Sequence, residues 1–286
     1  MPLINRLAII GVGLIGGSLA RVLRERGEVG EVVGIGRGRA NLERAVELGV
    51  IDRFSHDPVA GVAGADLVFL ATPVCTIGDL VREIAPGLAP GCIVTDGGSV
   101  KGEIVDACEH LMPPGTHFVG GHPIAGTEKS GVDASFATLY QGRRCILTPT
   151  SATDPVALST VRRMWEIAGS EVVLMDTIKH DKVMGAVSHL PHMVAYSLVN
   201  AVGGYDRCDE NLLKYSAGGF RDFTRIASSD PVMWRDIALM NRDALLEMMD
   251  FFAGWFADLR RLIESGNGEG LEQFFARSKG YRDGIG

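Results

Sequence analysis

The sequence predicts an α/β fold with two parts: an N-terminal, doubly wound, mostly parallel sheet, and a second domain that is all-helical. Short apolar runs alternate with amphipathic stretches through the first half, which is typical of a sheet with helices on both faces. After Met175 the strand pattern ends and apolar residues recur with the helical period. We therefore expect one domain over residues 1–175 and another over residues 176–286.

Apolar runs and helical periodicity give the elements of the first part in order. Strands are predicted at Leu7–Ile10, Val32–Ile35, Leu67–Ala71, Ile93–Thr95, Phe118–Val119, Cys145–Leu147 and Val172–Met175. Helices are predicted at Ser18–Arg26, Asn41–Leu48, Ile77–Leu88, Lys101–Leu111 and Val156–Ala168. In the second part, helical patterns cover Thr177–Val202, Asn211–Tyr215, Pro231–Ser265 and Gly270–Lys279. Asp230 and Pro231 form an N-cap followed by a proline at the first helical position.

Composition excludes several classes of protein. The chain has 286 residues, of which 46% are hydrophobic and 22% charged, as in ordinary globular proteins. Its net charge of −7 argues against nucleic acid or an anionic membrane as a partner. Its five cysteines form no C-x-x-C pair, which suits reduced thiols in a cytoplasmic protein. We expect neither a signal peptide nor a membrane-spanning helix.

A glycine-rich turn, Gly11-Val12-Gly13-Leu14-Ile15-Gly16, joins the first predicted strand to the first predicted helix. Glycines at this spacing permit a tight turn, a close approach of backbone to a pyrophosphate, and close packing of helix on strand. Alone, G-x-G-x-x-G is a weak signal, and an ordinary structural turn is the alternative. Its strand–turn–helix context indicates a dinucleotide cofactor, with Gly11, Gly13, Leu14, Ile15 and Gly16 as binding residues.

The end of the second predicted strand bears on which dinucleotide is used. An acidic residue about 20 residues after the glycines usually binds the ribose 2′-hydroxyl of NAD. Here no carboxylate stands between Glu31 and Glu43, and Arg37 and Arg39 occupy the region instead. A guanidinium can hold the extra phosphate of NADP, so we favour NADP over NAD. The alternative is that both arginines are merely solvated loop residues.

Loops after three later strands should meet the cofactor, because ligands of open α/β sheets lie at the carboxyl ends of the strands. They bring Thr72 and Pro73, then Ser99, then His122. Ser99 could equally be the N-cap of the next helix. His122 stands between glycines and a proline, where we expect neither regular helix nor strand. A histidine in such a loop can exchange protons near neutral pH, although a purely structural loop histidine stays open at this point.

Taken together, these motifs resemble those of the prephenate dehydrogenase family, which comprises prephenate, arogenate and cyclohexadienyl dehydrogenases. The motifs are Gly120–Gly131, Thr95–Lys101, His180-Asp181, Ser188–His192, Phe220–Pro231 and Met233–Asp236. The resemblance implies oxidative decarboxylation of prephenate to 4-hydroxyphenylpyruvate, or of arogenate to tyrosine, with hydride transfer to NAD(P). It also implies a Rossmann-type domain joined to a helical domain that binds substrate and forms a homodimer.

The resemblance further implies roles for single residues. His122 would accept the proton of the substrate hydroxyl, and Ser99 would hydrogen-bond near it. Arg225 matches the family's carboxylate-binding arginine, although spacing alone favours a surface arginine paired with Asp222 or Asp230. The remaining expected substrate-site residues match or border family motifs. They are His180, His192, Thr127, Glu128, Gly218 and Trp234.

Three alternatives remain at this stage. His189 and His192, with Asp181 upstream, could bind a metal, but Pro191 lies between the histidines and no third ligand has an obvious spacing, so we expect none. A β-hydroxyacid dehydrogenase would share this architecture, but its catalytic lysine is missing after Gly185. A non-catalytic nucleotide-sensing module is the third alternative, and it would not need His122.

The late helix around Ala244–Phe256 is apolar over most of its circumference. A single subunit of this size would have difficulty covering such a helix, which predicts a homodimer through the helical domain.

Overall fold

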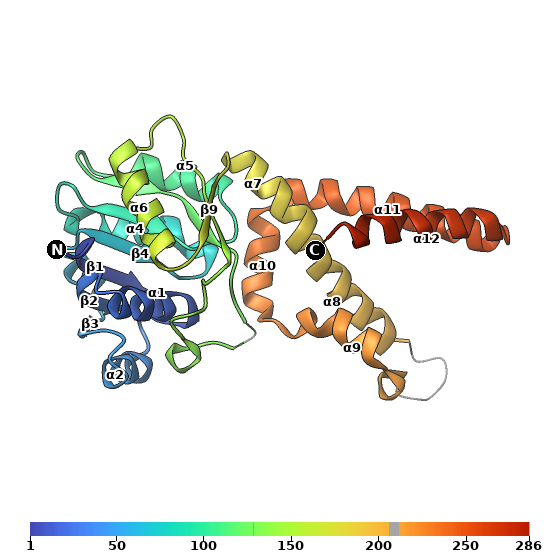
Figure 1. The fold of residues 1–286 in the computed structure, drawn as a ribbon, viewed down its shortest axis with the longest axis horizontal. Helices are drawn as coiled ribbons and strands as arrows, with labels where there is room; N and C mark the ends of the chain where they lie inside the picture. Colours follow the sequence, from blue (N-terminus) through green and yellow to red (C-terminus); the bar gives the residue numbers. More distant parts are fainter. Residues whose placement is uncertain (128, 206–211, 286) are drawn as a thin grey trace. The chain divides into compact units, whose positions relative to one another are not determined.

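The computed structural model describes residues 1–127, 129–205 and 212–285. Its main sheet has six parallel strands in the order β3-β2-β1-β4-β5-β6 (Figure 1). These strands are β1 (Ile4–Ile10), β2 (Val29–Ile35), β3 (Arg53–Ser55), β4 (Leu67–Leu70), β5 (Ile93–Asp96) and β6 (His117–Val119). The strand order reverses between β1 and β4, so a crevice for a ligand is expected at their carboxyl ends. The predicted fold class is confirmed.

Helices connect the strands, and several have clear start signals. They are α1 (Leu14–Glu25), α2 (Arg39–Glu47), α3 (Pro58–Val62), α4 (Ile77–Ile84), α5 (Gly102–Leu111) and α6 (Pro155–Ile167). Asp57 and Asp154 cap α3 and α6 with their carboxylates, and a proline follows each cap. Such a cap satisfies amide groups that have no partner within the helix.

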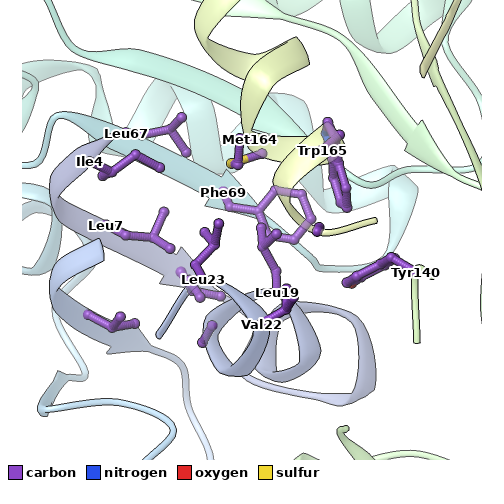
Figure 2. Packing of buried hydrophobic residues seen from close by; sticks show 14 of the residues in the cluster. Ile4, Leu7, Leu19, Val22, Leu23, Leu67, Phe69, Tyr140, Met164 and Trp165 are labelled. Carbon is purple, nitrogen blue, oxygen red and sulfur yellow. The ribbon is translucent and has the colours of Figure 1, made fainter. Parts of the chain in front are cut away.

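The core lies on both faces of the sheet because successive side chains of a strand point to opposite faces. Leu7 of β1 belongs to one cluster, together with Leu19 of α1 and Trp165 of α6 (Figure 2). Ala8 belongs to the other cluster, which is covered by apolar side chains of α4 and α5. Both faces of β1 are therefore buried, which accounts for its nearly continuous apolar run.

A second, smaller sheet continues the chain after β6. It contains β7 (Gly121–Pro123), β8 (Arg144–Leu147) and β9 (Glu171–Leu174) in that order. β7 runs antiparallel to β8, whereas β8 and β9 are parallel. The sequence did not predict β3, α3 or β7, all of which are five residues or shorter.

After β9 the described residues form helices. They are α7 (Thr177–Met184), the π-helix η4 (Gly185–His189), α8 (Leu190–Gly203), the 3-10 helix η5 (Leu212–Tyr215), α9 (Gly218–Thr224), the 3-10 helix η6 (Arg225–Ser228) and α10 (Pro231–Met240). The predicted helix at Thr177–Val202 is therefore divided by a π turn, which precedes Pro191. Asp230 caps α10 as predicted.

The chain divides into two compact units, residues 1–241 and residues 242–286. The first unit includes helices α7 to α10 as well as both sheets. The second unit contains α11 (Arg242–Glu264) and α12 (Gly268–Asp283). The single helix predicted over Pro231–Ser265 was wrong, because α10 ends before Asn241. Across the described residues, no helix combines the length and apolar character needed to cross a membrane.

Candidate active site

The glycine-rich turn after β1 has the geometry that a dinucleotide needs. Gly11 has a φ of 97°, and a side chain there would collide with the Ala71 carbonyl. A Cβ on Gly16 would collide with the carbonyl of Gly11, so the third glycine lets α1 pack against the turn. Gly13, the N-cap of α1, faces open space and has no capping side chain. The amides at the start of this helix are therefore available to a phosphate group.

The carboxyl ends of the central strands meet at this turn. The Ala71 amide donates to the Ile10 carbonyl at 2.8 Å, and the Gly97 amide donates to the Leu70 carbonyl at 2.9 Å. Thr72 follows Ala71, and its methyl group lies beside Gly11. The expected neighbours Thr72, Pro73 and Ser99 therefore follow strands that end beside the glycine-rich turn, and Leu14 and Ile15 form the first turn of α1.

Arg37 and Arg39 are both exposed just after β2. The Arg39 Nε is 2.8 Å from the Glu43 carboxylate. Glu31 is paired with Arg6 and Arg53 and lies in the first half of β2, so it does not stand where a ribose-binding carboxylate would. The described residues thus offer cations at the end of β2.

His122 lies on a strand, which corrects the expectation of an irregular, surface loop. It is the middle residue of β7, is only 8% exposed, and pairs with Ile146 of β8. The preceding amide, of Gly121, donates to the Asp96 carboxylate at 3.0 Å and ties β7 to the end of β5. His122 is therefore held rigidly at the carboxyl edge of the main sheet.

The ring of His122 contacts a second buried histidine. Its Nδ1 is 2.8 Å from Nε2 of His180, on α7, and the Nδ1 of His180 is 2.7 Å from the Asp181 carboxylate. His180 was expected to line the substrate site. It is instead completely buried, and both of its ring nitrogens already have protein partners.

Asp181 joins this pair of histidines to the start of α5. Its carboxylate accepts the amides of Lys101 and Gly102 at 2.8 and 2.7 Å. Burial raises the pKa of Asp181, but the hydrogen bonds from His180 and these two amides outweigh it, so the pKa is lowered overall. The cap of α5 thus comes from Asp181, and Ser99, the alternative cap in the sequence, does not provide it.

A buried ion pair lies beside His122. Lys101 and Asp96 are both completely buried, and the Lys101 ammonium contacts the Asp96 carboxylate. Burial lowers the pKa of His122 well below its usual value, and the charges of His180, Lys101 and His189 lower it further. His122 is therefore unprotonated at neutral pH. Ser99 is half-buried, and within the described residues it forms no hydrogen bond with His122.

A second group of expected residues gathers around Trp234 of α10. His192 of α8 stacks on the indole with ring centroids 3.6 Å apart, and its Nδ1 donates to the Ser188 carbonyl at 2.9 Å. Burial lowers the pKa of His192, and the positive charge of Arg225 lowers it as well. Arg225 begins η6 and is exposed. The two regions of the expected substrate site thus belong to the same compact unit.

Two buried donors in this region have no partner among the described residues. They are Nε1 of Trp234 and Nε2 of His189, whose rings lie 5.9 Å apart. The Asn241 amide nitrogen, which donates to the Asp181 carbonyl at 2.8 Å, is also 2.9 Å from Nδ1 of His189. Nδ1 therefore accepts, and the proton of neutral His189 is on Nε2.

Three expected site residues remain, and the structure gives the surroundings of two of them. Thr127 is exposed and lines a cavity of about 270 Å³ with Phe136 and Arg143. Gly218 is exposed at the start of α9. Glu128 lies outside the described residues.

Comparison with protein families covers most of the chain. The family described as "Prephenate dehydrogenase, nucleotide-binding domain" matches residues 19–174, and "Prephenate dehydrogenase, dimerization domain" matches residues 176–277. The chain belongs to the prephenate dehydrogenase family. The enzymes of this family oxidatively decarboxylate prephenate or arogenate in tyrosine biosynthesis, and this chain is accordingly a dehydrogenase.

Individual members of the prephenate dehydrogenase family align over nearly all of the chain. A cyclohexadienyl dehydrogenase of Zymomonas mobilis is 38% identical over 98% of this chain and 95% of its own length. A prephenate dehydrogenase of Aquifex aeolicus, solved with hydroxyphenyl propionate and NAD+, is 40% identical with a TM-score of 0.93, over 99% of this chain and 98% of its own. The arogenate dehydrogenase of Synechocystis is 32% identical with a TM-score of 0.83, over 97% and 99%.

Membership of the prephenate dehydrogenase family decides against the hydroxyacid dehydrogenase alternative. In the described part of the chain, no group of three or more His, Cys, Asp or Glu side chains is arranged to hold a metal ion. Asp96, Lys101 and Asn241 were not expected in the site from the sequence. Asp96 and Lys101 stand within the motif Thr95–Lys101, but their burial depends on how β5, β7 and α7 pack, which the motif does not reveal.

Proposed function

We propose that this chain oxidises prephenate, arogenate or both with NAD(P), and that His122 is the base for the reaction. The observation that carries this proposal is the environment of His122. Its strand is tied to the carboxyl end of β5, its Nδ1 is engaged, and burial keeps it neutral. A neutral histidine with one free nitrogen is suited to accept a proton.

The chemistry requires one proton acceptor and one hydride acceptor. The bound nicotinamide supplies the hydride acceptor. Nε2 of His122 takes the proton from the substrate hydroxyl as the ring carbon loses its hydride and becomes a carbonyl. The bond to the ring carboxylate then breaks, its electron pair makes the ring aromatic, and carbon dioxide leaves. His122 returns its proton to the phenolate oxygen, so the base is regenerated.

Arg225 is proposed to bind a substrate carboxylate, with His192 and Trp234 beside it. Prephenate has two carboxylates, and a guanidinium can bind such a group with two parallel hydrogen bonds. The effect of Arg225 on the pKa of His192 supports their proximity, and the stacking of His192 on Trp234 supports a shared pocket. Thr127 and Gly218 are proposed to border the substrate, and Glu128 keeps the same proposed role.

The cofactor is proposed to lie on Gly11, Gly13 and Gly16, with its phosphates at the start of α1. Leu14 and Ile15 would contact it in the first turn of that helix, and Thr72, Pro73 and Ser99 would border the nicotinamide. We favour NADP over NAD because Arg37 and Arg39, rather than a carboxylate, follow β2. Hydride transfer itself is the same with either cofactor.

The homodimer is proposed to form through the helical region, with substrate-binding residues 176–286 as one functional domain and residues 1–175 as the nucleotide-binding domain. The second compact unit supports the dimer, since α11 exposes Phe251, Phe252 and Phe256. These side chains and residues of α12 line a cavity of about 590 Å³. A large exposed apolar surface is typical of a subunit interface. We place the enzyme in the cytoplasm.

An assay that crosses both substrates with both cofactors tests the proposed function. We expect reduced nicotinamide to form with at least one substrate, together with one equivalent of carbon dioxide. Purified enzyme that reduces neither cofactor with either substrate would contradict the proposal. A non-catalytic nucleotide-binding module would give that result while still binding NAD(P).

A further inference from the structure

The contacts behind His122 form a continuous line of hydrogen bonds that ends at a carboxylate. Nδ1 of His122 meets Nε2 of His180 at 2.8 Å, and Nδ1 of His180 meets the Asp181 carboxylate at 2.7 Å. Each nitrogen of a neutral imidazole is either a donor or an acceptor, so the role at one end of the line determines all the others.

Asp181 determines the direction of this line. Its carboxylate accepts two backbone amides, of Lys101 and Gly102, so it is an acceptor toward His180 as well. Nδ1 of His180 must then carry the proton. Neutral His180 offers the lone pair of Nε2 to His122, which must donate from Nδ1. The only lone pair that remains on the His122 ring is that of Nε2.

We propose that His180 and Asp181 are positioning residues that fix the tautomer of His122, so that the lone pair of Nε2 is available to the substrate hydroxyl. This inference rests on the proposed role of His122 as the base. In the opposite tautomer, Nε2 of His122 would carry a proton and could not accept another. His180 thus acts through His122, and Asp181 acts through His180.

Backbone contacts hold Asp181 in a fixed position, so its carboxylate imposes this tautomer on His180 and, through His180, on His122. Asp181 caps the start of α5, and its own backbone carbonyl accepts a hydrogen bond from Asn241 at 2.8 Å. His180 is completely buried, so water does not compete for its nitrogens. The other charged or titratable groups that influence His122 are the Lys101 ammonium and His189, and both lower its pKa and so favour its neutral form.

Asp181→Asn is the first test, because it keeps the shape of the side chain but allows an amide N–H to face His180. That arrangement reverses both tautomers. We expect kcat to fall by about 10²-fold or more, with the KM of cofactor and substrate within about twofold. Asp176→Asn is the matched control, since Asp176 caps the same helix, α7, through the Lys179 amide and lies outside the site. It should keep wild-type kcat.

A pair of substitutions at His180 separates tautomer control from packing. His180→Gln keeps an acceptor that can face Nδ1 of His122, whereas His180→Leu has none. We expect the glutamine enzyme to turn over at least about tenfold faster than the leucine enzyme, and its residual rate to keep the wild-type pH profile. Equal rates for the two variants would contradict the proposal.

The tautomer can also be observed directly in the wild-type protein, and a variant is needed only to assign the signals. Histidine labelled with ¹⁵N gives two-bond ¹H–¹⁵N patterns that distinguish Nδ1–H from Nε2–H. The His122 signals are those that His122→Asn removes. At neutral pH we expect Nδ1–H, and a proton on Nε2 would overturn the inference, as would wild-type kcat in Asp181→Asn. If the wild-type enzyme oxidises neither substrate, the proposed function fails, and the spectrum still decides the tautomer.

Discussion

The ring nitrogens around His122 and those around Trp234 differ in whether they have hydrogen-bond partners. Nδ1 of His122, both nitrogens of His180 and the Asp181 carboxylate all have partners within the protein. Beside Trp234, its own Nε1 and Nε2 of His189 are buried without partners among the described residues. Buried polar groups in folded proteins nearly always find a partner. The hydroxyls of Thr95 and Thr148, beside Gly121 and Gly120, are also unpartnered, but only the Trp234 region leaves two neighbouring ring N–H donors without partners among the described residues.

This difference indicates that the His122 region is suited to proton transfer and the Trp234 region to binding the substrate. The proposed base, His122, is oriented before the substrate arrives, so little reorganisation would accompany proton transfer. The region of Trp234 and Arg225 holds donors that a substrate carboxylate could satisfy. Changes near His122 should therefore mainly affect kcat, and changes near Arg225 and Trp234 should mainly affect KM.

The largest effect is expected from His122→Asn, which removes the proposed base but keeps a polar side chain on β7. We expect kcat to fall by about 10³-fold, because general-base catalysis contributes about 10²–10⁴-fold. The Kd of the cofactor, measured by fluorescence titration, should change little. His110→Asn is the control, since His110 is exposed at the end of α5. An asparagine variant with near wild-type kcat would remove the proposed base.

Arg225→Ala tests the proposed substrate-binding region. Loss of a charged hydrogen bond costs about 1.5–3 kcal/mol, so we expect the KM of the substrate to rise by about 10²-fold while kcat falls by less than about tenfold. Steady-state kinetics with saturating cofactor measures both. Arg221→Ala, on the exposed surface of α9, serves as the control and should leave KM unchanged. A fall in kcat with no change in KM would contradict the assignment of substrate binding to the Arg225 region.

A smaller effect is expected on the preference for NADP when the arginines after β2 are changed. Like Arg225, Arg37 and Arg39 are exposed cations, and Arg39 already has Glu43 as a partner. In a variant with both changed to serine, we expect the ratio of kcat/KM for NADP to that for NAD to fall by about tenfold. Arg82→Ser, at an exposed ion pair of α4, is the control. An unchanged ratio would show that these arginines are solvated loop residues.

Trp234→Phe should give the smallest effect, and it tests a single hydrogen-bond donor of the Trp234 region. Phenylalanine keeps an aromatic ring against His192 but removes the unpartnered N–H. We expect the KM of the substrate to rise by about 2–10-fold, which corresponds to one neutral hydrogen bond. The thermal midpoint should not fall appreciably, because the free enzyme loses no hydrogen bond. An unchanged KM would argue that this indole does not contact substrate.

Local sequence was sufficient for much of the nucleotide-binding part. Apolar runs located seven of its strands, and the glycine pattern located the turn at Gly11. In the helical part, Asp230-Pro231 located the start of α10. β7 was missed because a strand of three residues that contains glycine and proline has no local strand signal. It exists because Gly121 binds Asp96 and because β8 supplies a partner strand.

The supporting residues of the site could not be predicted for a related reason. Asp181 reaches the amide of Lys101 across 80 residues of sequence, and His122 reaches His180 across 58. Spacing alone allowed His189, His192 and Asp181 to be considered as metal ligands. In the fold, both histidines pack against Trp234, whereas the Asp181 carboxylate binds His180 and the start of α5. The family resemblance proposed His122 and Arg225 as site residues, whereas the order of contacts behind His122 required the fold.

The pH dependence of kcat/KM tests the central claim, a buried neutral base at His122, most directly. Because the pKa of His122 is lowered, the base stays unprotonated down to a pH below the usual histidine value of about 6.5. We expect activity to be constant above that pH and to fall only as the pH drops through the lowered pKa. A loss of activity that begins at about pH 6.5 or higher, or an unchanged acid limb in His122→Asn, would contradict the account.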